Sequence, residues 1–199
     1  MSLDREDLIA AIERLKDEMD NNFDLLNTAD GALGDGDLGV TMTRGMHAIY
    51  EMRESLPDDL GMLLFQCAQA FTKTSGSSYG TLLATGLMAA AKLLKGQTTL
   101  NPNNLAELIA TSRDKMQERG KAELGGKTVL DSLDYLSKAV ANSDDKSLAA
   151  SQAVDAALND FRDKPATIGR ARIFGDKSVG MDDPGMLAMS LIVHAVARR

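Results

Sequence analysis

The sequence has one cysteine and two histidines among its 199 residues. A single cysteine, Cys67, cannot form an internal disulfide, and its place in an apolar run predicts a small buried side chain. His47 and His194 lie in helical patterns away from any motif, so we expect structural roles for both. The longest apolar runs fall short of the roughly 18 residues that a membrane span needs, so no membrane partner is expected.

Basic residues are also scarce relative to acidic ones. There are 22 Lys and Arg against 29 Asp and Glu, which gives a net charge of −7. This balance argues against nucleic acid or an anionic membrane as the main partner. The charged start, "MSLDREDLIA", does not resemble a signal peptide, so we expect a cytoplasmic protein. A phosphate site here would need local cations or metal ions to offset the acidic field.

Helical periodicity, in contrast, runs along the whole chain. Strand signals are weak, and only "ARIF" at 171–174 is compatible with a short extended piece. We therefore predict one all-α domain, 1–199, built as a helical bundle with the apolar helix 79–94 at its centre. Ser2 is the expected N-cap of the first helix, and Asp183 that of the last. The eight expected helices cover 4–19, 41–54, 57–73, 79–94, 101–119, 128–141, 146–161 and a segment that starts at 183.

Four stretches rich in glycine, charged and hydroxyl residues interrupt these helices. Any one of them is also typical of an ordinary turn. Four such loops between apolar helices indicate instead that the loops carry the function and the helices hold them. The stretches are 30–39, 74–80, 120–128 and 169–185.

The first loop gathers carboxylates in "GALGDGDLGVTMTRG", directly after Asp30. Asp35 and Asp37 repel each other unless a cation is shared between them, and all-oxygen ligands suit magnesium or calcium better than zinc. An EF-hand that starts at Asp35 fails at the fifth, sixth and twelfth positions of that motif. The loop therefore predicts a magnesium site. The alternative is a capping loop in which Asp37 only caps the next helix.

The other three loops offer groups for an anion. "KTSGSSYG" places hydroxyl groups before a helix start, and "RGKAELGGKT" places two lysines there, although the spacing excludes a Walker A motif. The last loop carries Arg170, Arg172 and Lys177, and an arginine can neutralise a phosphoryl group or form an ordinary surface salt bridge. Together the loops predict a magnesium-dependent phosphate or nucleotide site at one end of the bundle.

The same four stretches, in the same order, resemble the motifs of the nucleotide-binding L subunit of dihydroxyacetone kinase. The pattern G-D-x-D-H-G-x-N-M-x-x-G reads "GDGDLGVTMTRG" here, and G-x-S-G-P-x-Y-G reads "KTSGSSYG". The pattern G-K-A-x-x-G-D-K-T reads "GKAELGGKT", and the final block, which ends in D-P-G, reads "GRARIFGDKSVGMDDPG". The resemblance covers essentially the whole chain. It implies an eight-helix antiparallel barrel with a nucleotide pocket at one end.

The resemblance also implies a division of roles within the site. Asp30, Asp35 and Asp37 would hold two magnesium ions that bind the phosphates of ADP or ATP. Arg170 would be the catalytic residue that neutralises the moving phosphoryl group. The positions expected to contact the nucleotide are Leu38, Gly39, Val40, Thr41, Thr74, Ser75, Gly76, Gly120, Val129, Arg170, Asp183, Pro184 and Gly185.

In that family the substrate, a small ketose, is held by a histidine on a separate K subunit. The resemblance therefore implies a K-type partner and no ketose site on this chain. Two phosphate donors stay open: exchangeable ATP, or a bound nucleotide recharged by a phosphotransferase-system M subunit. A homodimer is also compatible with the resemblance. The alternative function is a non-catalytic nucleotide-binding protein with a regulatory or docking role.

Three departures from the family pattern bear on these expectations. Leu38 replaces a histidine, so one donor to a phosphate is lost, and Thr41 replaces an asparagine but can still form hydrogen bonds. Gly126 replaces an acidic residue. The three aspartates and Arg170 are present, which favours a working phosphoryl-transfer subunit. The departures favour a divergent branch, in which the ketose could be a tetrulose instead of dihydroxyacetone.

Overall fold

The computed structural model describes residues 2–74 and 76–198, and that part of the chain folds into nine α-helices and three 3-10 segments. No helix in these ranges has the length and hydrophobicity needed to cross a lipid bilayer. The helices are α1 (Arg5–Asn21), α2 (Phe23–Leu33), α3 (Leu38–Glu51), α4 (Leu60–Thr74), α5 (Ser78–Leu93), α6 (Leu105–Gly120), α7 (Val129–Ala141), α8 (Lys146–Arg162) and α9 (Pro184–Ala197). The 3-10 segments are η1 (Arg53–Ser55), η2 (Pro102–Asn104) and η3 (Arg170–Ser178).

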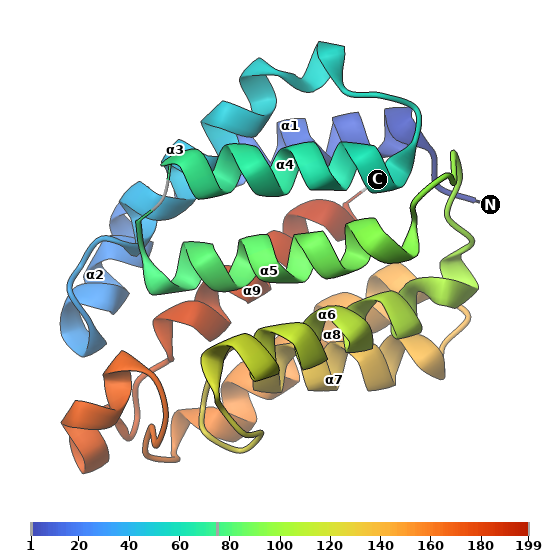
Figure 1. Ribbon diagram of the computed structural model, residues 1–199. Helices are drawn as coiled ribbons and strands as arrows, with labels where there is room; N and C mark the ends of the chain where they lie inside the picture. The colour runs from blue at the N-terminus through green and yellow to red at the C-terminus, as the bar shows by residue number, and fades with distance from the viewer. Residues whose placement is uncertain (1, 75, 199) are drawn as a thin grey trace.

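Eight of these helices form a closed barrel (Figure 1). Along the chain α1, α3 and then each helix up to α9 pack against the next, and α9 packs against α1 to close the ring. The short helix α2 stands at one end, where it contacts α3, α9 and η3. The predicted all-α antiparallel barrel is confirmed, and α2 is an additional helix that the periodicity did not predict.

Helix α2 escaped prediction because its apolar signal is weak. Only Leu26 and Leu33 are buried among its residues, and its last turn runs into the glycine-rich loop. Asp30 consequently lies in a helix and not in the loop. The expected extended piece at 171–174 was also wrong, since these residues belong to η3.

The start of the first helix differs from the expectation too. Asp4, and not Ser2, is the N-cap of α1, and its carboxylate accepts hydrogen bonds from the amides of Glu6 and Asp7. The carboxylate of Asp7 in turn accepts the backbone amide of Asp4, which completes a capping box. A carboxylate satisfies two otherwise unpaired amides here, whereas a serine two residues earlier cannot reach them.

The helix expected at the centre of the bundle is α5, and it is instead one of the barrel helices. Met88 and Leu93 on its outer face are 40% and 38% exposed. Its inner face consists of small residues, which allow close approach: a Cβ on Gly86 would lie 2.8 Å from the sulfur of Met116. Helix α9 is the more deeply buried helix, and it supplies residues to three separate core clusters.

The histidines and the cysteine have the structural roles expected for them. His47 Nε2 lies 2.8 Å from Asp20, which links α3 to α1, and His194 Nε2 lies 2.9 Å from Asp155, which links α9 to α8. Cys67 is buried in the core, and this burial raises the pKa of its thiol to about 12.

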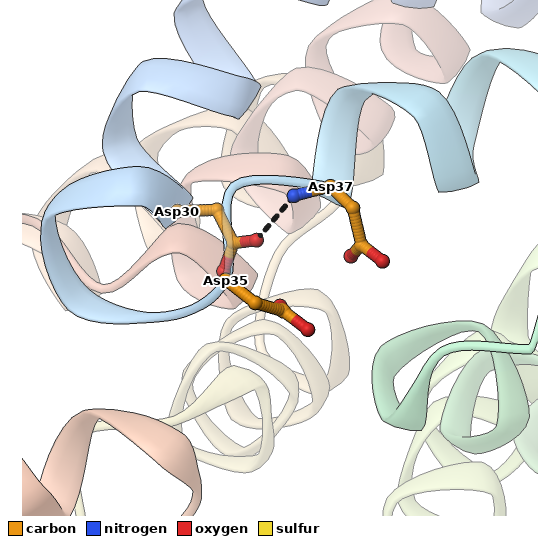
Figure 2. Close-up of side chains that lie close together, drawn as sticks. All are labelled: Asp30, Asp35 and Asp37. Carbon is orange, nitrogen blue, oxygen red and sulfur yellow. Dashed lines mark hydrogen bonds between the residues drawn. The ribbon is translucent and has the colours of Figure 1, made fainter.

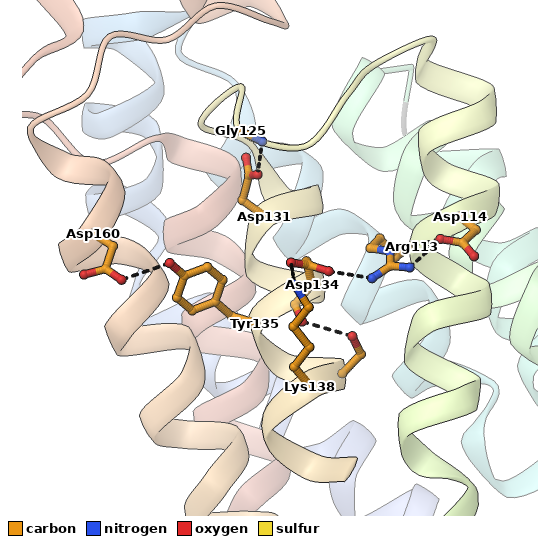
Figure 3. A network of polar contacts seen from close by, with 9 residues as sticks. Arg113, Asp114, Gly125, Asp131, Asp134, Tyr135, Lys138 and Asp160 are labelled. Carbon is orange, nitrogen blue, oxygen red and sulfur yellow. Dashed lines mark hydrogen bonds and ion pairs between the residues drawn. The ribbon is translucent and has the colours of Figure 1, made fainter. Parts of the chain in front are cut away.

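Polar side chains also connect α6, α7 and α8 (Figure 3). Asp134 accepts hydrogen bonds from Arg113 and Lys138, both at 2.7 Å. The hydroxyl of Tyr135 donates to Asp160 at 2.9 Å. Because Asp134 is almost fully buried, its two cationic partners offset the cost of removing its charge from water.

Candidate functional site: a cavity at one end of the barrel

A cavity of about 840 Å³ opens at the end of the barrel that carries α2 and η3. Helices α3, α5, α7 and α9 all begin at this end (Figure 1). The first residue of each of these helices lines the cavity: Leu38, Ser78, Val129 and Pro184. Four helix N-termini therefore bring positive dipole ends to one space, which favours an anionic ligand.

Three carboxylates stand together in this cavity. One oxygen from each of Asp30, Asp35 and Asp37 lies within 4.8 Å of the other two. Asp30 projects from the last turn of α2, and its Oδ2 accepts the amide of Asp37 at 2.9 Å (Figure 2). Gly36, at φ +79°, supplies the left-handed turn between the other two aspartates. The loop therefore presents three hard oxygen ligands at one place.

Asp37 holds the N-cap position of α3, but its side chain makes no capping hydrogen bond. The first amides of α3 are satisfied by another residue: Asn27 Oδ1 accepts from Gly39 at 2.8 Å and from Val40 at 3.3 Å. A Cβ at Gly39 would lie 2.3 Å from the carbonyl oxygen of Phe23, so this close approach of α2 needs the glycine. The capping interpretation of Asp37 therefore fails, and its carboxylate is left for a ligand.

The carboxylates have one close cationic partner among the described ion pairs, since Arg170 of η3 forms an ion pair with Asp35. One guanidinium cannot neutralise three carboxylates at this spacing. All-oxygen ligands with residual negative charge fit magnesium, which is bound through a few carboxylates together with phosphate oxygens. The donor set thus fits the metal that the sequence predicted.

The starts of α5 and α9 are joined to each other at the cavity wall. The hydroxyl of Tyr79 donates to the carbonyl of Gly185 at 2.9 Å, and burial raises the pKa of Tyr79. A Cβ at Gly185 would lie 2.9 Å from the Tyr79 ring, so the glycine lets the two helix starts approach.

Asp183 caps α9, since its Oδ1 accepts the amide of Met186 at 2.9 Å. Burial raises the pKa of Asp183 to about 7, while its bonds from backbone amides and the charge of Lys127 act in the opposite direction.

The rest of the wall combines an apolar patch with cations. The apolar part is Leu82, Met116, Val129 and Leu130, which belong to a core cluster. Exposed cations also line the cavity: Arg119, Lys121, Arg170 and Arg172. A cavity with an apolar wall, a carboxylate cluster and four helix starts suits a ligand that has one flat apolar part and one polyanionic part.

Residues 32–198 match the model of the DAK2 domain. The chain belongs to the DAK2 domain family. It is 28% identical to the ADP-binding subunit DhaL of PEP-dependent dihydroxyacetone kinase 1 from Listeria innocua, over 98% of this chain and 97% of that protein. It is 27% identical to the corresponding DhaL subunit from Escherichia coli, over 99% and 98% of the two chains.

Longer proteins share the same fold or sequence over part of their length. L-erythrulose kinase from Pectobacterium atrosepticum is 27% identical, over 94% of this chain and 34% of that protein. The solved dihydroxyacetone kinase from C. freundii, in complex with AMP-PNP and Mg²⁺, superposes with a TM-score of 0.76 at 24% identity, over 95% of this chain and 33% of that one. This last likeness establishes the fold.

The cavity of this DAK2 domain brings together most of the residues selected from the sequence. Gly39, Val40, Thr41 and Thr74 do not line it. The amides of the first two are taken by Asn27, Thr41 is buried, and Thr74 Oγ1 bonds to carbonyls of its own helix. Ser75 lies outside the described residues. Those that line the cavity are Asp30, Asp35, Asp37, Leu38, Gly76, Gly120, Val129, Arg170, Asp183, Pro184 and Gly185.

The departures from the family pattern have local explanations. Leu38 is 4% exposed and packs in the main core cluster, so the lost histidine is replaced by an apolar contact. A Cβ at Gly126 would lie 2.7 Å from Ile168 Cδ1. Ile168, which lines the cavity, thus occupies the space that an acidic side chain at 126 would need.

Sequence reasoning missed two kinds of residue at the site. Asn27 carries no motif signal, because its role depends on contact with α3. Arg119 and Ile173 also line the cavity; both lie in stretches singled out from the sequence, but neither was selected as a site residue. The "GKT" lysine shows the reverse case: Lys127 was expected to attract an anion, but it does not line the cavity, and its ammonium is bound to backbone carbonyls.

Proposed function

We propose that this DAK2 domain is the nucleotide-binding, phosphoryl-transfer subunit of a small-ketose kinase. The observation that carries the proposal is the carboxylate cluster: Asp37 is released from helix capping by Asn27 and faces the same space as Asp30 and Asp35. The similarity to DhaL subunits along almost their full length supports it.

The residues that line the cavity have two proposed roles, which are binding of the nucleotide and neutralisation of charge. Asp30, Asp35 and Asp37 would hold two magnesium ions, and the four helix starts would orient the nucleotide phosphates. When bound, magnesium neutralises charge on the phosphates and polarises the one that moves. Arg170 lies beside the carboxylates and pairs with Asp35, and from there its guanidinium would stabilise the charge that develops on the transferred group. The apolar patch accepts the nucleobase.

The acceptor ketose belongs on a K-type partner subunit. Among the described residues both histidines pair with aspartates away from the cavity, so neither is placed to hold a ketose there. The PEP-dependent and PTS-dependent names of the DhaL relatives favour a bound ADP that an M subunit recharges. The L-erythrulose kinase relatives support a tetrulose as the alternative to dihydroxyacetone.

A reconstituted assay tests the function. The purified chain, a K subunit and Mg²⁺ are combined with ADP or ATP, a phosphotransferase-system donor where ADP is used, and a panel of small ketoses. We expect phosphorylated ketose, and mass spectrometry of the chain as purified should detect co-purified ADP. Tight nucleotide binding without turnover on any ketose would contradict a catalytic subunit and favour the regulatory or docking protein.

A further inference from the structure

Lys127 is the most deeply buried charged side chain among the described residues, with 0% exposure. Its Nζ donates to the carbonyls of Arg162 and Lys164 at 2.9 Å and to that of Ser178 at 2.8 Å. An ammonium has three donors, so all of them are satisfied by backbone. The residue has a φ of +61°, an uncommon conformation for a non-glycine residue, which the surrounding contacts must hold in place.

The three carbonyls mark the two ends of one loop. Helix α8 ends at Arg162, so the Arg162 carbonyl is one that its helix leaves unpaired. Lys164 stands just after that helix end, and Ser178 is the last residue of η3. A single ammonium therefore closes the loop 164–178 at its base. The loop residues that line the cavity all lie between these ends: Thr167, Ile168, Gly169, Arg170, Ala171, Arg172 and Ile173.

Ser178 reinforces this closure. Its hydroxyl, fully buried, accepts the amide of Ala166 at 2.8 Å and donates to the carbonyl of Gly175 at 2.6 Å. The amide of Gly180 also donates to the Arg162 carbonyl at 2.8 Å. A lysine of the third sequence block and a serine of the fourth thus meet beneath the loop that carries Arg170.

We propose that Lys127 is a positioning residue for phosphoryl transfer: its ammonium closes the 164–178 loop and so holds Arg170 beside the carboxylate cluster. The role of Arg170 rests on the proposed function, whereas the loop closure can be measured without any nucleotide. Removing the ammonium takes one donor from each of the three carbonyls. The Arg162 carbonyl keeps the amide of Gly180 and the Ser178 carbonyl keeps that of Met181, but no bond then joins the two ends of the loop through one group, so the loop ends can separate.

The first test uses hydrogen exchange on the full chain without nucleotide. Lys127→Met keeps most of the unbranched side chain but removes its donors, and Lys92→Met, at an exposed position of α5, is the matched control. We expect the amides of Ala166, Thr167 and Gly180 to exchange at least about 10-fold faster in Lys127→Met, with α3 to α5 unchanged. Unchanged loop exchange would overturn the proposal, as would equal acceleration in every helix.

If Lys127→Met does not fold, Lys127→Ala replaces it. The alanine variant is refolded with propylammonium, which supplies the missing chain and charge, and with propanol as the uncharged control. Recovery of the loop protection with propylammonium alone supports the proposal. Equal results with the two compounds would contradict it.

The second test separates positioning from binding. Misplacement of a catalytic group by about 1 Å can cost about 100-fold in rate, so we expect kcat of Lys127→Met to fall by about that factor. Affinity for Mg²⁺-ADP should change less than about 3-fold, because the carboxylates and helix starts are untouched. Equal losses in kcat and affinity would contradict the positioning role. If the parent chain has no turnover, the proposed function fails. The hydrogen-exchange measurement then still decides whether Lys127 closes the loop.

Discussion

Aspartates stand at helix starts at both ends of the barrel, but they do different work. At the end away from the cavity, Asp59 accepts the amides of Met62 and Gly96, both at 2.9 Å, and these bonds lower the pKa of Asp59. At the cavity end, Asp37 stands at a helix start and caps nothing, because Asn27 takes the amides of α3. A carboxylate at a helix start becomes available to a ligand when another residue does the capping.

The largest effect expected from this comparison concerns Asp35 and Asp37, the carboxylates that cap no helix. Asp35→Asn and Asp37→Asn should each weaken Mg²⁺-dependent nucleotide binding by about 100-fold or more, because a hard anionic ligand is lost. The fold should remain, since neither side chain caps a helix. Calorimetric titration with Mg²⁺-ADP measures the affinity, and circular dichroism checks the helices. Binding at the parent level would contradict the metal assignment.

The next effect concerns the cation that faces the cluster. Arg170→Ala should lower kcat by about 10² to 10³ and change nucleotide affinity by less than about 3-fold, since its charge acts on the transition state. Lys177→Ala, in the same segment but away from the cavity wall, is the control for a lost surface cation. Steady-state kinetics with a K subunit provides both constants. Equal losses in the two constants would make Arg170 a binding residue.

A smaller effect concerns Asp183, a cap that does face the cavity. In the folded chain the pKa of Asp183 is about 7, above its usual value of about 4. As pH rises from about 4, this carboxyl group therefore loses its proton in the unfolded chain before it does so in the folded chain. The parent therefore loses stability between about pH 4 and 7, and regains it on acidification. Asp183→Asn keeps the cap but not the titration. Urea unfolding measures the free energy of unfolding at pH 5 and at pH 8. Between these pH values the stability of the variant should rise by about 1–2 kcal/mol relative to that of the parent. If the stability of the variant and of the parent changed with pH in the same way, the raised pKa of Asp183 would be refuted.

The smallest effect is expected at the far end of the barrel. Asp59→Ala should lower Tm by about 2–4 °C, because the start of α4 and the Gly96 turn lose a shared acceptor. Nucleotide affinity should stay the same. Thermal unfolding and the same calorimetric titration test both points. A loss of affinity would mean that the two ends of the barrel are coupled, and the comparison above would then fail.

The barrel and the carboxylate cluster were predictable from the sequence, and the helix that completes the site was not. Periodicity and caps such as Asp183-Pro184 act within a few residues, so they located the eight barrel helices. Helix α2 has too few buried positions to give such a signal, and Asn27 on it has no motif. The apolar helix 79–94 misled in another way, since its small residues allow close packing without placing it at the centre.

By itself, the sequence determined the helical class and the loop that carries Asp35 and Asp37. These depend on residue spacing, on glycine conformations and on groups that interact with their near neighbours in the chain. Only the tertiary structure decided which polar side chains are bound within the protein and which are available to a ligand. Asn27 binds amides 12 and 13 residues away, and Lys127 binds carbonyls 35, 37 and 51 residues away. Such contacts depend on how the helices pack, so they make Asp37 a candidate ligand and Lys127 a buried structural cation.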